Sequence, residues 1–296
     1  MMLYFFSSNL THFFYLGFMK SFDPSELPIP KVHDLLLSSI APRPIAFVST
    51  ISANGEINLS PFSFFNVFGA NPPICIFSPA RSGRTGETKN TLDFIQETKE
   101  CVINIVNEDI LHQMNLASGE YPKGINEFKK AGFTMLASEK VTPPRVAESF
   151  VQLECKVLQV IETGTGGGSG NLVISEVVMI HVSEKVLDEN NNIQPLKMKY
   201  IARLSKDFYC RVDAANLFEV PKPKPASALG MGFDQLPYFI RNSDTLTGNE
   251  LAQLASLETI PTLENFDLTL ETKSAKECIA ERDLLTAWKI LLASHK

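Results

Sequence analysis

Short apolar runs separated by turn residues dominate the chain between residues 44 and 212. Residues 44–53 are rich in apolar and β-branched side chains, and Asn54-Gly55 follows them directly. Asn-Gly is a strong signal for a tight turn between two antiparallel strands. Residues 56–68 continue with an extended pattern. We therefore predict a β-hairpin that pairs residues 44–53 with one extended segment, residues 56–68.

The rest of this region carries further strand patterns and a few short helical ones. The predicted strands are residues 73–77, 101–106, 151–162, 172–186 and 203–212. The predicted helices are residues 91–97, capped by Asn90 or Thr91, residues 108–117, and residues 126–131, which Gly132 ends. Many strands with short helices between them are typical of a β-barrel or sandwich and not of a sheet built from βαβ units.

The composition changes at Pro221, Pro223 and Pro225, which alternate with lysines. Alternating prolines favour an extended polyproline conformation and cannot lie inside a sheet. We place a domain boundary there, so that residues 19–220 form one domain and residues 221–296 form a proline-rich linker with a helical C-terminal extension. Apolar residues at helical spacing predict one helix over residues 274–293, and we expect this extension to act as a lid or a dimer-packing arm.

The first 18 residues contain no charged side chain and many aromatic ones. They lack the positive region and the small-residue cleavage site of a signal peptide, and polar residues interrupt them before the ~20 apolar residues that a spanning helix needs. Our hypothesis is that Met19 is the true start and that residues 1–18 are a non-native or disordered extension. A weak membrane anchor is the alternative. Detection of residues before Met19 by mass spectrometry of the native protein would contradict the hypothesis that Met19 is the true start.

The length and amino-acid composition fit an ordinary globular protein, and the net charge argues against nucleic acid as a partner. The chain has 296 residues, of which 44% are hydrophobic and 20% charged, with a net charge of −6 and a pI near 5.5. An acidic protein offers little of the basic face that binds a nucleic-acid backbone. The five cysteines are scattered, without the spacing of a disulfide framework or a zinc site. We expect buried, reduced thiols in a cytoplasmic protein without a metal site.

A glycine-rich run at residues 164–171 invites comparison with nucleotide-binding loops. It matches neither G-x-G-x-x-G nor the Gly-Lys-Ser/Thr of a P-loop, and it joins two predicted strands where a phosphate loop would open a helix. We therefore interpret the run as a mobile hairpin loop.

A basic, hydroxyl-rich segment precedes and begins the predicted helix over residues 91–97. It consists of Arg81, Arg84, Thr88, Lys89, Asn90 and Thr91. The helix dipole favours an anion at a helix N-terminus, and lysine and hydroxyl groups add charge-assisted hydrogen bonds. The segment is a candidate phosphate site, although an ordinary capped helix on a basic surface explains the same residues.

Polar and aromatic residues alternate over residues 60–66. On one extended strand, Ser60, Phe62, Phe64 and Asn66 share a face. Core packing accounts for the phenylalanines but gives no reason for the serines and the asparagine. Short polar groups beside aromatic rings suit a flat heteroaromatic ligand with carbonyl edges, so a ligand wall and a packed core both remain open.

The order of these motifs resembles that of the flavin reductase-like, FMN-binding split-barrel family. The motifs are residues 43–50, Asn54-Gly55, residues 58–66, residues 71–73 and residues 89–91. The resemblance covers about residues 30–212. It implies a mainly β fold, namely a Greek-key split β-barrel with short helices, and a homodimer that binds FMN at the subunit interface.

The resemblance also implies roles for individual residues. Lys89 and Thr91 hold the FMN phosphate in this interpretation, and Asn90 stands where the family usually has aspartate. Ser205-Lys206 replaces the family's glycine pair. The predicted cofactor-binding residues are Thr50, Ser60, Ser63, Phe64, Phe65, Asn66, Ser78, Arg81, Lys89, Asn90, Thr91 and Arg203. We expect no catalytic side chain, because the chemistry takes place at N5 of FMN.

Two functions follow from the resemblance. The first is an FMN-dependent oxidoreductase in which hydride passes from NAD(P)H through FMN to a small electron acceptor, with an oxygenase as a candidate partner. The second is an FMN-binding electron carrier that has no NAD(P)H reductase activity of its own. We expect neither nucleic acid nor a membrane among the partners.

Overall fold

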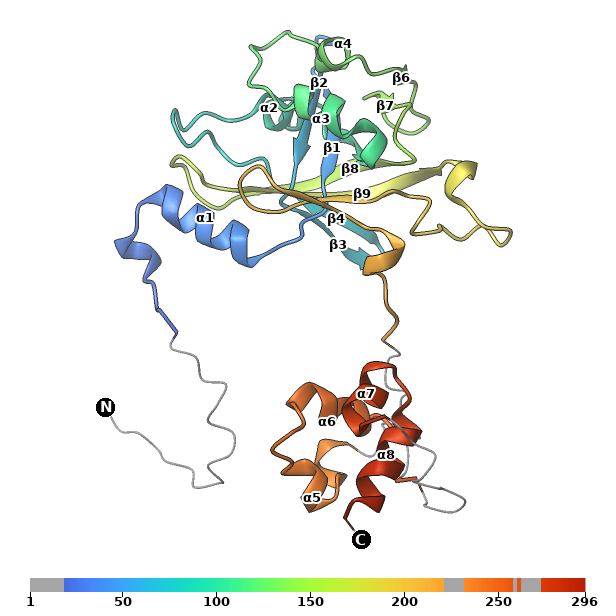
Figure 1. Cartoon of the computed structure of the whole chain (residues 1–296). Helices are drawn as coiled ribbons and strands as arrows, with labels where there is room; N and C mark the ends of the chain where they lie inside the picture. Colours follow the sequence, from blue (N-terminus) through green and yellow to red (C-terminus); the bar gives the residue numbers. More distant parts are fainter. Residues whose placement is uncertain (1–18, 221–231, 258–259, 262–272, 296) are drawn as a thin grey trace. The chain divides into compact units, whose positions relative to one another are not determined.

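The computed structural model describes residues 19–220, 232–257, 260–261 and 273–295, which fall into two compact units (Figure 1). The larger unit is Phe22–Leu217, and the other includes Phe218–Lys296. Residues 1–18 and the prolines of residues 221–225, on which the sequence carries predictions, lie outside the described residues. Within the described ranges, no helix is both long enough and apolar enough to span a membrane.

The larger unit is built on one antiparallel sheet of seven strands (Figure 1). In chain order the strands are β1 (Ala46–Ile51), β2 (Ile57–Phe62), β3 (Phe65–Ala70), β4 (Pro73–Phe77), β5 (Glu100–Ile105), β8 (Val151–Glu162) and β9 (Asn171–Val182). Their order across the sheet is β2-β1-β5-β8-β9-β4-β3. The hairpin predicted at Asn54-Gly55 is confirmed, because β1 and β2 pair antiparallel around Gly55, whose φ is +85°.

The chain order and the sheet order together require the sheet to curl. β2 and β3 lie at opposite edges of the sheet, yet only Ser63 and Phe64 separate them in the chain. The edges of a flat seven-stranded sheet would stand about 29 Å apart, whereas the three residue steps from Phe62 to Phe65 reach about 11 Å at most. The sheet therefore closes on itself as a split barrel, which confirms the mainly β split-barrel prediction.

The same crossing shows that the prediction of one extended segment over residues 56–68 is wrong. β2 pairs with β1, and β3 pairs with β4 at the other edge. One continuous strand cannot pair at both edges, so the chain breaks at Ser63 and Phe64. Ser60 and Asn66 consequently belong to different strands and do not share one face.

Two further strand predictions end differently in the structure. The single strand predicted over residues 203–212 is wrong, because residues 201–211 form a short hairpin of β10 (Ile201–Arg203) and β11 (Tyr209–Arg211). The turn between them is closed by a hydrogen bond from Leu204 N to Phe208 O at 3.0 Å, and Lys206 has a φ of +52°. The strand predicted over residues 172–186 is shorter in the structure, since β9 ends at Val182 and a 3-10 turn (Glu184–Val186) follows.

A further small two-stranded sheet pairs β6 (Met135–Leu136) with β7 (Arg145–Val146).

Short helices accompany the sheet in the larger unit. They are α1 (Ile29–Ser39), α2 (Asn90–Thr98), α3 (Leu111–Ala117), preceded by a 3-10 turn (Glu108–Ile110), and α4 (Glu127–Ala131). The N-cap of α2 is Lys89, in an extended conformation, so the prediction that Asn90 or Thr91 caps this helix is wrong; both residues already belong to its first turn. α1 has no counterpart among the predicted elements and contains no buried residue.

Strand β1 lies at the centre of the core and is buried on both faces. Phe47 packs with Leu59 and Phe128 on one face, whereas the next residue, Val48, packs with Leu92 and Phe77 on the other. This alternation follows from the two-residue period of a strand. Helices α3 and α4 therefore cover one side of β1, and α2 covers the other.

The second unit is helical, as the sequence predicts for this part of the chain. Its helices are α5 (Tyr238–Arg241), α6 (Gly248–Leu254), α7 (Ala275–Ala280) and α8 (Leu284–Ala293). The core centres on Trp288, which is fully buried and donates its indole N–H to a backbone carbonyl of α6 at 3.0 Å. The single helix predicted over residues 274–293 is wrong, because Arg282 has a φ of +65° and Asp283 caps a new helix.

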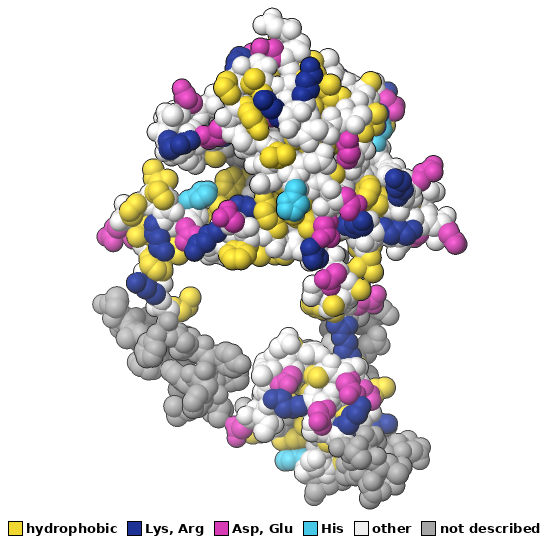
Figure 2. All heavy atoms as spheres, turned by 45° about the horizontal axis from the view of Figure 1, so that its top comes forward, with side chains coloured by type: hydrophobic (Ala, Val, Ile, Leu, Met, Phe, Trp, Pro, Cys, Tyr) yellow, Lys and Arg dark blue, Asp and Glu magenta, His cyan; other side chains and the backbone are white. Residues whose placement is uncertain are grey.

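The visible surface of the larger unit carries charges of both signs. Figure 2 shows Lys and Arg side chains interspersed with Asp and Glu, with hydrophobic side chains between them. No field of a single sign dominates this face, as the modest net charge of −6 would suggest. Four of the five cysteines are buried, namely Cys75, Cys101, Cys155 and Cys278.

One buried side chain, that of Arg43, joins three parts of the barrel. Its guanidinium donates to the carbonyls of Leu37 (2.6 Å), Ile40 (2.8 Å) and Leu204 (2.6 Å). Its Nε lies 3.4 Å from Ser63 Oγ, at the crossing between β2 and β3. Burial is the main cause that lowers the pKa of Arg43 from its ordinary value. Arg43 thus fastens the end of α1 and the β10–β11 turn to the point where the barrel closes.

The variant Arg43→Ala should lower the free energy of unfolding by about 2–4 kcal/mol, because three backbone carbonyls lose charge-assisted hydrogen bonds. Arg211→Ala is the matched control, since it breaks an exposed ion pair with Glu108 and should cost less than about 1 kcal/mol. Urea denaturation of both variants measures the difference. Equal losses would contradict the role assigned to Arg43.

Candidate functional site

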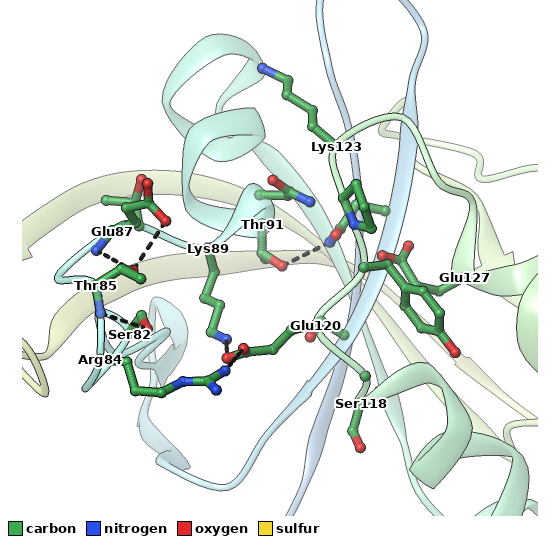
Figure 3. Close-up of a pocket in the computed structure, with 17 residues that line it drawn as sticks. Ser82, Arg84, Thr85, Glu87, Lys89, Thr91, Ser118, Glu120, Lys123 and Glu127 are labelled. Carbon is green, nitrogen blue, oxygen red and sulfur yellow. Dashed lines mark hydrogen bonds and ion pairs between the residues drawn. The ribbon is translucent and has the colours of Figure 1, made fainter.

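A cavity of about 300 Å³ opens where the start of α2 approaches β2 (Figure 3). Residues from the segment 82–91 line one part of it, and residues 118–123, after α3, line another. Asn58 and Ser60 of β2 and Glu127 of α4 complete the lining. The closure of the barrel and the packing of α2 on the sheet thus bring together segments that are far apart in the sequence.

Two cations and one carboxylate face one another in this cavity (Figure 3). Lys89 Nζ lies 3.0 Å from Glu120 Oε1, and Arg84 Nη2 lies 2.6 Å from Glu120 Oε2. The hydrogen bond from Lys89 is the main cause that holds the pKa of Glu120 below its ordinary value, and Arg84 adds to it. The ionised carboxylate therefore occupies the place between the cations that another anion could take.

Thr91 ties the start of α2 to the β1–β2 hairpin. Its buried hydroxyl oxygen accepts a hydrogen bond from Asn58 Nδ2 at 2.8 Å. Asn58 stands opposite Thr50 in the strand register, and its Nδ2 also lies 3.4 Å from Thr50 Oγ1. Because Thr91 Oγ1 accepts from Asn58, its own hydrogen remains available as a donor.

This set of donors fits a phosphate monoester. Lys89 and Arg84 supply two positive charges, and Thr91 supplies a hydroxyl. Lys89 is the N-cap of α2 and Thr91 belongs to its first turn, whereas Arg84 comes from the preceding segment. A dianionic phosphate is stabilised by cations and by the unpaired N–H groups of a helix N-terminus. The structure therefore places Lys89 and Thr91 on one cavity, and their contact with a phosphate stays a prediction. Thr50, predicted to line the flavin, is not among the residues that line this cavity.

Glu127 is a residue of the cavity that the sequence analysis did not identify. Its side chain is buried, and its Oε2 accepts a hydrogen bond from Leu59 N of the edge strand β2 at 2.9 Å. Burial is the main cause that raises the pKa of Glu127 above its ordinary value. Glu127 fixes the position of β2, and with it Asn58 and Ser60. No local sequence signal marks this role, because an edge strand is recognised only in the folded sheet.

The glycine-rich run forms the loop between β8 and β9, as predicted, and packs against the segment that lines the cavity. Gly168 N donates to Arg81 O at 3.2 Å, and Arg81 N donates to Ser169 O at 2.9 Å. A Cβ at Gly167 would stand 3.0 Å from Gly83 O and 3.1 Å from Ser82 O. The approach of the two backbones accounts for glycine at position 167, and it supports the segment that carries Arg84.

The other predicted cofactor residues have different surroundings. Arg81 forms an ion pair with Glu162 at 3.1 Å. Ser78 is buried; its N donates to Phe64 O at 2.9 Å, and its Oγ accepts from Asn171 N at 3.0 Å. Asn171 is fully buried, and its Oδ1 has no hydrogen-bond partner among the described residues.

Residues 63–66 and Arg203 lie outside the lining of the cavity. Phe64 is 39% exposed and contacts the ring of His33, whereas Phe65 packs against the core. Asn66 is exposed on β3. Arg203 stacks its guanidinium 4.4 Å from the centre of the Tyr209 ring. Their contacts with a flavin remain predictions, whereas Ser60 and Asn90 do line the cavity.

Comparisons with known proteins cover the larger unit. Residues 38–201 match the family described as flavin reductase like domain, and this match ends before the second unit begins. An uncharacterized protein of Aquifex aeolicus (strain VF5) is 37% identical over 181 residues, which make up 61% of this chain and 89% of that protein.

Two solved structures are similar in both fold and sequence. Nitrilotriacetate monooxygenase component B from Bacillus cereus is 31% identical with a TM-score of 0.65, and the match covers 69% of this chain and 100% of that chain. The Pseudomonas fluorescens 2-nitrobenzoate 2-nitroreductase is 27% identical with a TM-score of 0.61, over 70% of this chain and 100% of that chain.

Proposed function

The chain belongs to the flavin reductase-like family, and from this premise we propose that it is an FMN-dependent oxidoreductase that passes hydride from NAD(P)H to a small electron acceptor. Its general class, a flavin oxidoreductase, is supported by the family and by the oxidoreductases among its structural neighbours. The choice of FMN, of NAD(P)H and of the acceptor is our proposal.

The observation that carries the proposal is the pair of cations at the start of α2. Lys89 and Arg84 hold a carboxylate between them, beside the available hydroxyl of Thr91. A phosphate monoester carries the same kind of charge with more acceptor oxygens, so FMN suits these residues better than riboflavin does. In this arrangement Lys89 and Thr91 hold the phosphate, with Asn90 beside them, and Thr50 and Ser60 line the ribityl chain.

We propose that the flavin ring lies at the crossing between β2 and β3, where Ser63, Phe64 and Ser78 come together. Phe64 offers an exposed aromatic face, and Ser63 and Ser78 offer short polar groups close to it. Phe65 and Asn66 belong to β3, which continues from this point. In this account Arg81 shapes the segment before α2, and Arg203 flanks the crossing through the pairing of its backbone with Arg43.

Bound FMN would supply the hydride chemistry at its N5 atom, and the protein would bind and orient it. Hydroxyl and amide donors that face the flavin stabilise negative charge on its reduced form. The relative from Bacillus cereus is component B of a nitrilotriacetate monooxygenase, which supports an oxygenase as a candidate recipient of the electrons.

The reductase function is tested by adding NADH, and then NADPH, to the FMN-loaded protein without oxygen. Bleaching of the flavin absorbance by either nucleotide, faster than that of free FMN at the same concentration, is the expected result and names the donor. Persistent absorbance with both nucleotides, in a protein that does bind FMN, would contradict the reductase function and favour the electron carrier.

The variant Lys89→Ala should weaken FMN binding by about 1.5–3 kcal/mol, the usual effect of losing one charge-assisted contact. Riboflavin, which has no phosphate, should bind the variant and the wild type equally. Lys199→Ala, which removes a lysine paired with Asp109 away from the cavity, is the control. Titrations followed by flavin fluorescence give the affinities of the three proteins for FMN and for riboflavin. An unchanged affinity for FMN would remove Lys89 from the phosphate site.

We also propose that the protein forms a homodimer through α1 and β3. α1 exposes Ile29 and Leu36 and buries none of its residues, and the edge strand β3 exposes Val67 and Phe68. Exposed apolar edge strands in native proteins are normally protected from solvent by another segment or subunit. We propose that a second copy of the chain packs against β3 in this way.

The double variant Val67→Lys with Phe68→Lys should be a monomer, because two charges on the interface oppose its burial. Leu116→Lys, which alters a side chain of similar exposure on α3, should leave the dimer intact. Light scattering after size-exclusion chromatography measures the masses. A dimer that persists in the double variant would place the interface elsewhere, and a monomeric wild type would end the proposal.

A further inference from the structure

Among the acidic residues of the cavity, Glu120 is the one whose carboxylate, within the described ranges, is bound by the side chains of Lys89 and Arg84. Its two oxygens are divided between Lys89 and Arg84, at 3.0 Å and 2.6 Å. It lies in the exposed segment after α3, and 54% of its side chain is accessible. Glu127, by contrast, is buried and bound to the backbone of β2. The carboxylate of Glu127 is therefore fixed, whereas that of Glu120 is free to move away.

The position of Glu120 conflicts with that of a bound phosphate. Lys89 and Arg84 are the cations paired with Glu120, and within the described ranges neither is paired with another carboxylate. A dianionic phosphate at these cations would also meet the like charge of Glu120 at close range. Binding of the phosphate therefore requires the carboxylate to leave.

We propose that Glu120 is a displaceable internal competitor that lowers the affinity of the site for phosphate-bearing ligands and thereby makes FMN an exchangeable ligand. This inference rests on the proposed function only in naming FMN as the ligand. The competition itself applies to any phosphate group that binds at Lys89 and Arg84. Riboflavin lacks the phosphate, so the competition does not act on it. Glu120 thus sets how strongly the site prefers FMN over riboflavin and how quickly FMN is released.

The competition should not depend on pH near neutrality. The neighbouring cations hold the pKa of Glu120 below its ordinary value, so protonation does not remove its charge in this range. Displacement must come from the ligand itself, since the phosphate offers the cations more charge and more oxygens than one carboxylate does.

Glu87→Gln provides a matched control for the charge of Glu120. Glu87 also lines the cavity, so the variant removes one negative charge from the same space. Its Oε2 accepts a hydrogen bond from Thr85, and in the part of the chain that the structure describes it forms no ion pair. A general electrostatic effect would change both variants equally, whereas direct competition changes only Glu120→Gln.

The experiment compares the full-length wild type with Glu120→Gln and Glu87→Gln by titration with FMN, riboflavin and inorganic phosphate. Glu120→Gln should bind FMN about three- to tenfold more tightly, as expected for freeing one or two partly exposed ion pairs, and should release FMN more slowly. Its affinity for inorganic phosphate should rise in parallel, and its affinity for riboflavin should stay unchanged. Glu120→Asp, too short to reach both cations, should lie between Glu120→Gln and the wild type.

Equal FMN and phosphate affinities in Glu120→Gln and the wild type would overturn the inference, as would weaker binding, which would make Glu120 a ligand residue. An equal gain in Glu87→Gln would also overturn it. If the wild type binds neither FMN nor riboflavin, the proposed function is contradicted but the inference about Glu120 is not. The titration with inorganic phosphate then decides whether Glu120 competes with a phosphate.

Discussion

The two-residue connection between β2 and β3 is the constraint on which the larger unit depends. Ser63 and Phe64 are too few to span an open seven-stranded sheet, so the two edges must meet. Once they meet, the interior of the sheet closes around β1, whose Phe47 and Val48 face opposite halves of the core. Arg43 then reaches the crossing at Ser63 Oγ, 3.4 Å from its Nε, while three backbone carbonyls hold its buried guanidinium.

The candidate site follows from the same closure. Packing of Leu92 and Ile95 against the barrel places the first turn of α2 beside the β1–β2 hairpin, where Asn58 joins Thr91. The unsatisfied N–H groups and cations of that turn attract negative charge, and the loop after α3 supplies it as Glu120. Within one cavity the fold thus combines a rigid base, fixed by Glu127, with an ion cluster on exposed side chains. In this proposal, the rigid part around Glu127 positions the ligand. The exposed cluster of Lys89, Arg84 and Glu120 determines how tightly the phosphate of the ligand is bound.

Local signals in the sequence predict those elements that local interactions determine. Asn54-Gly55 identifies its hairpin, and the predicted strands at residues 73–77 and 151–162 coincide with β4 and β8. The break at Ser63 is not predictable in this way, because the choice of pairing partner depends on the whole sheet. The break at Arg282 has no glycine or proline to mark it. In the site, residue type and spacing identify Lys89 and Thr91, whereas Glu120 and Glu127 are brought in by the fold.

A crystal structure of the protein with bound FMN tests the central claim most directly, because it locates the phosphate. We expect a phosphate within hydrogen-bonding distance of Lys89 Nζ and Thr91 Oγ1, with the carboxylate of Glu120 moved away from Lys89. A phosphate bound elsewhere, with the pair between Lys89 and Glu120 intact, would contradict the assignment of this cavity as the flavin phosphate site.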